Sequence, residues 1–284
     1  MDDRRRAWQA RYGGAGGPDE AAAVDAPAPD ALAAWNPLLE RLLGHRSVRA
    51  YLDRPLPAGT LEALVAAAQS AATSSNLQAW SVVAVESVDR RARLAELVGG
   101  QKHVAAAPLF LVWLADLSRL EQLGRQQGRT PAGLDYLELL LVGVIDAALA
   151  AQNAVVALES LDLACVYIGG IRNRPLEVAA ELALPPRVFP VFGLCVGHAD
   201  PRRPAAVKPR LPQAAVLHRE QYSPAATAGA VARYDATLAL FHASQGMSAP
   251  AWSTQAVDRV ATPEALTGRQ HLVDVLHRLG FPLA

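Results

Sequence analysis

Residues 134–170 read LDYLELLLVGVIDAALAAQNAVVALESLDLACVYIGG, and the rest of the chain is best understood by working outward from them. The first part contains helix formers and no proline, so it predicts a helix over Asp135–Leu161 with a length of roughly 40 Å. Only four residues in that range are charged: Asp135, Glu138, Asp146 and Glu159. A helix with so few charges is expected to be buried on nearly all sides, in a monomer core or in a subunit interface.

The pattern changes after this helix to a short apolar strand, Ala164–Ile168, which ends in Gly169-Gly170. Paired glycines leave the backbone N–H groups without a neighbouring Cβ, so a flat ligand can approach them closely. A plain turn is the alternative interpretation of the same two residues.

Composition excludes several classes of protein. Lys plus Arg and Asp plus Glu both number 27 in 284 residues, so no overall field attracts nucleic acid or an anionic membrane. The start of the chain has no apolar signal segment, and no uncharged apolar run reaches the roughly 18 residues of a membrane span. The two cysteines, Cys165 and Cys195, lie in apolar strands and predict reduced thiols in the cytoplasm. No histidines have metal-ligand spacing, so no metal site is expected.

The organisation expected from the sequence is a flexible N-terminal arm over residues 1–35, with at most one helical turn and no chemistry, followed by a single domain over residues 36–284. Asn36-Pro37 predicts a helix start, and Gly44 predicts its end. Further strands are expected over Ala79–Val85, Ala107–Ala115 and Val188–Gly197. A helix is expected over Ala228–Phe241, and a last one from Thr262 to Gly280.

Four polar segments between these elements are candidates for binding a polar or phosphate-bearing ligand. They are HRSVRAY at 45–51, TSSNLQ at 73–78, GGQKH at 99–103 and KPRLP at 208–212. Guanidinium groups offer fork-shaped donors that suit phosphate, although a short basic run is also typical of a solvated surface. Only two of the 27 basic residues are lysines, Lys102 and Lys208, which is a weak indication that a lysine is needed at 208.

In order and spacing these segments, with VYIGGIRN at 166–173 and LCVG at 194–197, resemble the nitroreductase superfamily, and specifically its larger branch of NADPH-dependent, oxygen-insensitive nitroreductases and flavin reductases. The resemblance covers residues 40–284. It implies an α+β fold with a mostly antiparallel sheet flanked by helices, where the sequence pattern alone suggests alternating α/β. It also implies an intertwined homodimer with FMN at the subunit interface, in which residues from about 213 to 284 wrap the partner.

The resemblance further implies a role for each matching residue. Cations would hold the FMN phosphate and ribityl end, namely His45, Arg46, Lys208 and Arg210. Arg49 would lie at the pyrimidine edge of the flavin, and Ser47 and Gln101 would add polar contacts. The turn formed by Tyr167, Ile168, Gly169 and Gly170 would direct a backbone N–H to flavin N5. The loop with Thr73, Ser75 and Asn76 would come from the other subunit, and Asn76 would lie over the flavin face, where it would contact the substrate.

No side-chain nucleophile is implied, so FMN would carry the chemistry between NADPH or NADH and a small electron-poor acceptor by a ping-pong mechanism. A flavin reductase that supplies reduced FMN to a monooxygenase, and a non-catalytic flavin-binding dimer, are the alternatives. Arg269 matches an arginine of the acceptor site, although a surface salt bridge is equally compatible. The segment Ser244–Ser248 carries no cation where relatives hold the extra phosphate of NADPH, so a preference for NADPH is not expected from it.

Overall fold

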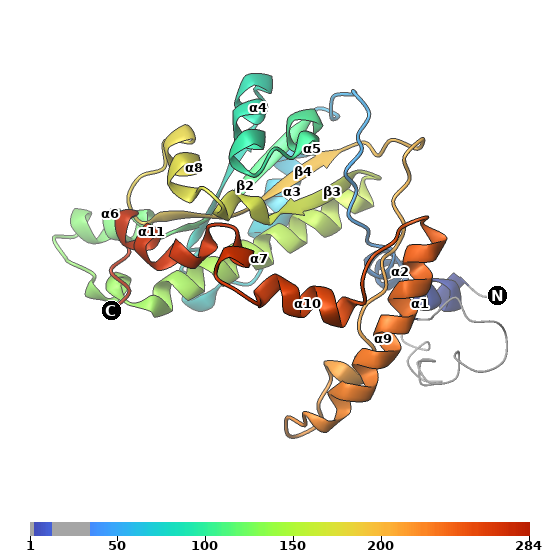
Figure 1. The fold of residues 1–284 in the computed structure, drawn as a ribbon. Coiled ribbons are helices and arrows are strands. Elements are labelled where there is room, and N and C mark those ends of the chain that lie inside the picture. The colour runs from blue at the N-terminus through green and yellow to red at the C-terminus, as the bar shows by residue number, and fades with distance from the viewer. Residues whose placement is uncertain (1–2, 13–34) are drawn as a thin grey trace. The chain divides into compact units, whose positions relative to one another are not determined.

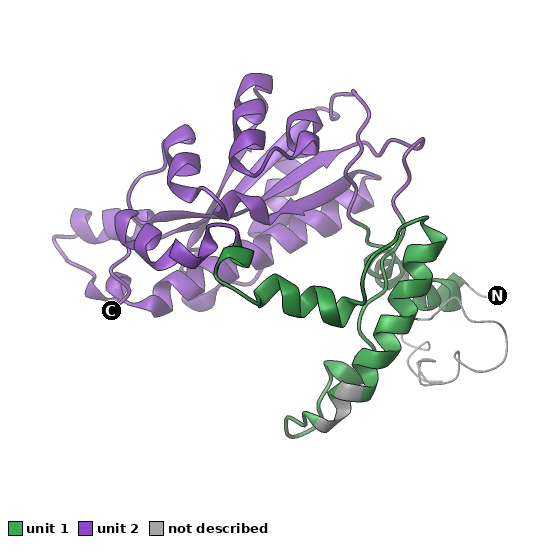
Figure 2. Ribbon diagram, in the orientation of Figure 1, with its two compact units in different colours: residues 1–46, 206–266 green, residues 47–205, 267–284 purple. Residues whose placement is uncertain are grey.

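The computed structural model describes residues 3–12 and 35–284 (Figure 1). They form two compact units (Figure 2). One comprises the described residues up to Arg46 together with Ala206–Leu266, and the other comprises Ser47–Ala205 with Thr267–Ala284. Each unit is described by itself.

The larger unit is built on a four-stranded sheet. Its strands are β1 (Trp80–Val85), β2 (Leu109–Asp116), β3 (Ala164–Ile168) and β4 (Val188–Gly197). The spatial order is β1-β2-β4-β3, and every neighbouring pair is antiparallel. The α+β class and the antiparallel order implied by the resemblance are therefore confirmed, whereas the alternating α/β arrangement suggested by the sequence pattern is wrong.

Helices cover both faces of this sheet, and the alternation of side chains along β2 explains why (Figure 1). Phe110, Val112 and Leu114 pack with α4 (Val88–Leu97), α5 (Lys102–Ala106) and α8 (Pro175–Glu181). Leu111 and Trp113 point to the opposite face, where α3 (Thr60–Gln69) and α7 (Leu137–Ser160) pack. All eight residues of β2 are buried, as expected for a strand between two layers of helices. A further helix, α6 (Ser118–Gln126), follows β2.

Helix α7 has nearly the bounds predicted from the sequence and follows a 3-10 turn at Ala132–Asp135. A Cβ atom on Gly143 would lie 3.0 Å from the Ala79 carbonyl oxygen, so glycine allows the helix to approach the sheet. Within the single chain one face of α7 is open, so the monomer core covers only part of the helix, and burial of the remaining face in a subunit interface stays a prediction. By length and composition α7 resembles a membrane span, yet half of its most apolar window is buried inside the fold.

The smaller unit is helical. It contains α1 (Asp3–Tyr12), α2 (Pro37–Leu43), α9 (Ala225–Ser244), α10 (Trp252–Val260) and 3-10 turns at Gln213–Ala215 and Glu264–Leu266. The predicted helix start at Asn36 is confirmed, since its side chain accepts a hydrogen bond from Leu39 N at 3.0 Å. Residues 3–12 form ten residues of helix where the sequence predicted at most one turn. The remainder of the expected arm, residues 13–34, lies outside the described residues.

The last helix is shorter than predicted. Instead of running from Thr262 to Gly280, the chain forms a 3-10 turn at Arg269–His271 and then α11 (Leu272–Arg278). Gly268 interrupts the helix with a φ of +85°, and a Cβ there would lie 3.0 Å from the Asn173 carbonyl oxygen. Arg269 therefore lies in a turn beside Asn173 rather than on a helix surface.

Candidate functional site

The Gly169-Gly170 turn is shaped by its neighbours. β3 ends at Ile168, and a 3-10 turn follows over Gly169–Arg172. A Cβ on Gly170 would lie 2.6 Å from the Val98 carbonyl oxygen and 2.7 Å from Gln101 Nε2, so only glycine fits there. Gln101 Nε2 donates to the same carbonyl at 2.8 Å. The structure thus brings Gln101 against the glycine turn.

The segment with Ser47 and Arg49 runs beside β3. Ser47 forms a parallel bridge with Cys165, and Val48 N donates to the Cys165 carbonyl oxygen at 2.8 Å. Tyr51 fixes the following turn, since its hydroxyl donates to the Val48 carbonyl oxygen at 2.7 Å. Ser47 and Arg49 are exposed, so their side chains are available at the start of the strand that leads into the glycine turn.

Tyr167 and Ile168, the last two residues of β3, have different surroundings. Tyr167 is 36% exposed and packs edge-on against the ring of Phe192, with the ring centroids 5.2 Å apart. Ile168 is only 1% exposed and belongs to the core beneath the sheet. Of the two, only Tyr167 therefore offers its side chain to a ligand, and Ile168 offers its backbone.

His103 is a candidate that sequence reasoning missed. Burial and the positive charge of Arg49 both lower the pKa of its imidazole, burial more than the charge. Its Nε2 atom is buried and has no hydrogen-bond partner among the described residues. A neutral ring with an unsatisfied nitrogen near Arg49 is suited to a polar ligand. Its position two residues after Gln101, in the same polar segment, could have identified it from the sequence.

A buried carboxylate, whose role could not be assigned from the sequence, holds the TSSN loop. Asp146 of α7 is 1% exposed. Its Oδ2 accepts from Thr73 Oγ1 at 2.7 Å and from Ala79 N at 3.0 Å, and its Oδ1 accepts from Ser74 N at 3.3 Å. Ser75 and Asn76 then adopt positive φ angles of 50° and 55° and expose their side chains.

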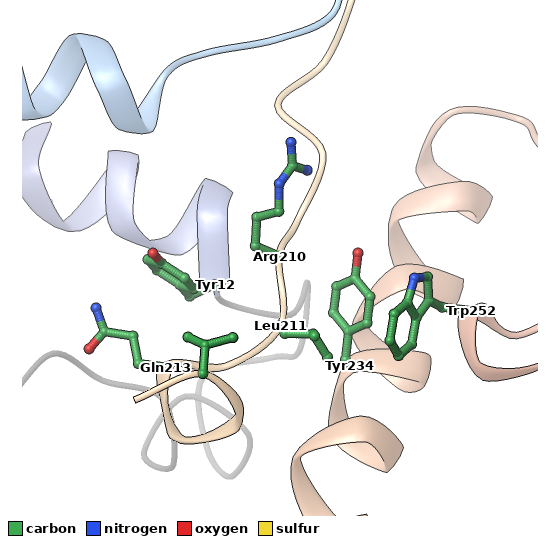
Figure 3. A pocket seen from close by; sticks show the side chains of 7 residues that line it. Tyr12, Arg210, Leu211, Gln213, Tyr234 and Trp252 are labelled. Atoms are coloured by element: carbon green, nitrogen blue, oxygen red, sulfur yellow. The ribbon is translucent and has the colours of Figure 1, made fainter. Parts of the chain in front are cut away.

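The smaller unit holds the other predicted cations. The backbones of His45 and Lys208 are neighbours, because both carbonyl oxygens accept hydrogen bonds from the guanidinium of Arg11. Arg46, Lys208 and Arg210 are exposed. A cavity of about 310 Å³ lies beside Arg210 and is lined by the rings of Tyr12, Tyr234 and Trp252, among others (Figure 3).

Arg269 lies at the glycine turn. Its Nε donates to Asn173 Oδ1 at 3.0 Å, and its Nη2 is 3.8 Å from the position that a Cβ of Gly169 would occupy. Its guanidinium therefore lies beside the residues to which the resemblance assigns the flavin ring. By contrast, no hydrogen bond or ion pair within the described residues joins Thr73, Ser75 or Asn76 to the remaining candidates.

Metal-binding groups and thiols add nothing further to the site. Across residues 3–12 and 35–284, no three His, Cys, Asp or Glu side chains are placed to hold a metal ion. Cys165 and Cys195 are both free and buried in the sheet.

Comparison with known proteins gives matches over most of the chain. The family model described as the nitroreductase family matches residues 42–198, and the model of its C-terminal domain matches residues 208–284. An oxygen-insensitive NADPH nitroreductase of Salmonella typhimurium is 40% identical over 248 residues, which are 87% of this chain and 98% of that protein. An FMN reductase (NADPH) of Bacillus subtilis is 42% identical over 189 residues, 66% of this chain and 75% of its own length.

A solved structure agrees with these matches. The NADPH:FMN oxidoreductase from Vibrio harveyi, complexed with NAD+, superimposes with a TM-score of 0.78 at 32% identity. The superposition covers 88% of this chain and all of that one.

Proposed function

Because the chain belongs to the nitroreductase family, we propose that it is an FMN-dependent oxidoreductase that passes hydride from NADPH or NADH to a small electron-poor acceptor, such as a nitroaromatic compound or a quinone. Bound FMN supplies the hydride carrier, and the protein supplies binding and electrostatics. The relatives named NADPH nitroreductase and FMN reductase support this proposal.

The observation that carries the proposal is a set of cations without counterions. Arg46, Arg49 and Lys208 form no ion pair within the described part of the chain. Three unpaired cations in the segments assigned to FMN fit a ligand that brings its own negative charge, as a flavin phosphate does. Gln101 and the close-fitting Gly170 turn add the polar and backbone groups that a flat ring requires.

Each residue then has a defined task. His45, Arg46, Lys208 and Arg210 bind the phosphate and ribityl end. Arg49 would stabilise a negatively charged, reduced flavin ring more than the neutral ring. Ser47 and Gln101 would orient the pyrimidine end, the turn at Gly169 and Gly170 would offer backbone N–H groups to the flavin ring, and Arg269 would bind the acceptor or the nicotinamide.

The proposal includes a homodimer, and the open face of α7 supports it. Leu137, Leu141, Ile145 and Leu149 are spaced four residues apart and are 47%, 47%, 55% and 43% exposed. Residues at this spacing lie on one face of a helix, and a continuous apolar stripe of this kind marks a protein interface. In the dimer, the loop with Thr73, Ser75 and Asn76 would reach the partner's flavin, and residues from about 213 would wrap the partner. The two free cysteines support a cytoplasmic location.

Placing charge on the stripe tests the dimer. The double substitution Leu141→Glu and Ile145→Glu should convert the protein to a monomer in sedimentation velocity and abolish FMN binding, because two carboxylates cannot be buried in an apolar interface. Val88→Glu, at a residue that is 65% exposed on α4, is the matched control and should stay dimeric. A double variant that remains dimeric would assign the interface to another surface.

Anaerobic stopped-flow mixing of the FMN-loaded protein with NADPH or NADH tests the reaction itself. Both should bleach the flavin absorbance, and their rate constants at equal concentration should differ by less than about tenfold, because no cation lies in Ser244–Ser248 to bind the extra phosphate. Flavin that stays oxidised with both donors would show a non-catalytic flavin-binding protein instead.

The Bacillus subtilis relative named FMN reductase favours a second candidate, release of reduced FMN to a partner monooxygenase. Steady-state turnover with added FMN, compared with turnover of nitroaromatics and quinones, separates the two. A kcat/KM highest for free FMN would favour the flavin reductase.

A further inference from the structure

The N-terminal helix α1 carries a buried arginine that ties two distant segments together. Arg11 is only 5% exposed. Its Nε and Nη2 donate to the Leu43 carbonyl oxygen at 3.1 and 2.8 Å, and Nη2 also donates to the His45 carbonyl oxygen at 2.6 Å. Nη1 donates to the Lys208 carbonyl oxygen at 2.9 Å. One guanidinium therefore links the end of α2 to the segment that begins at Lys208.

The contact is reciprocal, because the backbone of α1 also takes part. The amide of Arg210 donates to the Arg11 carbonyl oxygen at 2.9 Å. Tyr12, the next residue of α1, lines the cavity beside Arg210 (Figure 3). From the other side, the hydroxyl of buried Tyr234 donates to the Pro209 carbonyl oxygen at 3.0 Å. The backbone of residues 208–210 is thus fixed from two helices.

These contacts have an energetic rationale. An isolated helix of ten residues is marginal in water, so α1 depends on docking for its stability. A cation buried without partners is strongly unfavourable, and Arg11 is stable in its place because carbonyl oxygens accept from all three of its nitrogens. If either segment moved, one of these donors would lose its acceptor, so the guanidinium holds both segments in one arrangement.

We propose that Arg11 is a positioning residue for the phosphate end of FMN, which sets the spacing between the pair His45 and Arg46 and the pair Lys208 and Arg210. This inference rests on the proposed function, since it takes these four residues as the phosphate site. Arg11 lies outside both matched ranges, residues 42–198 and 208–284. The contacts that α1 makes with the phosphate site are therefore not part of the family match. The guanidinium of Arg11 donates to backbone oxygens of Leu43, His45 and Lys208, which is why its role is positioning rather than direct binding.

Substitution in the full-length protein tests the proposal. Arg11→Met removes the donors and keeps the length of the side chain, and Arg11→Lys keeps the charge but donates from one nitrogen instead of three. Arg5→Met, on an exposed residue of the same helix, is the matched control. Each apoprotein is titrated with FMN and with riboflavin, which lacks the phosphate, by flavin fluorescence quenching.

We expect Arg11→Met to raise the Kd for FMN about tenfold and that for riboflavin less than twofold, as loss of one well-placed charge-assisted contact would. Arg11→Lys should show a smaller loss of selectivity for FMN over riboflavin. Because it keeps the charge, it also tests the proposal if Arg11→Met fails to fold. Arg5→Met should match the wild type. Equal weakening of both ligands, or no weakening of FMN, would overturn the proposal.

A further variant separates failure of this inference from failure of the proposed function. Replacing both Lys208 and Arg210 with methionine removes the phosphate contacts themselves. If that double variant loses FMN selectivity and Arg11→Met does not, Arg11 has no positioning role and the site stands. If neither variant changes the ratio of FMN to riboflavin affinity, the phosphate site itself is misassigned.

Discussion

Asp146→Ala is expected to lower the free energy of unfolding by about 3 kcal/mol and to weaken FMN binding at the same time. The carboxylate is buried and accepts hydrogen bonds from Thr73, Ser74 and Ala79, so its removal leaves two backbone amides and a hydroxyl without an acceptor. The loop that begins at Thr73 would lose its conformation, and the proposed contacts from Thr73 and Ser75 to the partner's flavin would be lost with it. Urea denaturation and FMN titration measure the two effects.

Glu138→Ala is the matched control for this change, because Glu138 is an exposed carboxylate in the first turn of the same helix. Its loss removes only a favourable interaction with the helix dipole, within about 1 kcal/mol. Equal effects of the two substitutions would mean that Asp146 does not hold the loop.

The double substitution Lys208→Met and Arg210→Met is expected to raise the Kd for FMN by at least about 100-fold, because two charge-assisted contacts to the phosphate are lost together. Affinity for riboflavin should change little, since it has no phosphate to bind. Isothermal titration calorimetry of the apoprotein with each ligand gives both constants.

The control must change the net charge of the protein by the same amount. Arg203→Met with Arg219→Met does so at two exposed arginines outside the proposed site. If this pair weakens FMN binding as much as the Lys208 and Arg210 pair, the effect is a general field effect, and the assignment of a specific phosphate site would be wrong.

Strands and the central helix could be predicted from the sequence because their signals are local. The apolar runs of β2 and β4 and the proline-free run of α7 carry their own periodicity. The antiparallel order could not be read this way, since it depends on which strands pair across long connections. It came from the resemblance and is confirmed by pairs such as Leu109 with Val196.

Site residues in local motifs could also be predicted from the sequence, whereas those with distant partners could not. Residues in compact motifs, such as Gly170 and Gln101, could be proposed from the sequence because the motif itself carries the resemblance. Arg11 and Asp146 could not, because their partners lie far away: Lys208 is 197 residues from Arg11, and Thr73 is 73 residues from Asp146. The broken last helix was missed for a similar reason, since the space at Gly268 is limited by Asn173.

The burial of both cysteines has a consequence for the reactivity of their thiols. Burial raises the pKa of the Cys165 thiol to about 12, and it also raises that of Cys195. The thiolate is the form that attacks disulfides and is oxidised by peroxide, so burial keeps both thiols in their less reactive, protonated form at neutral pH. Because both sulfur atoms also lie buried in the sheet, neither is exposed to oxidants in the folded protein.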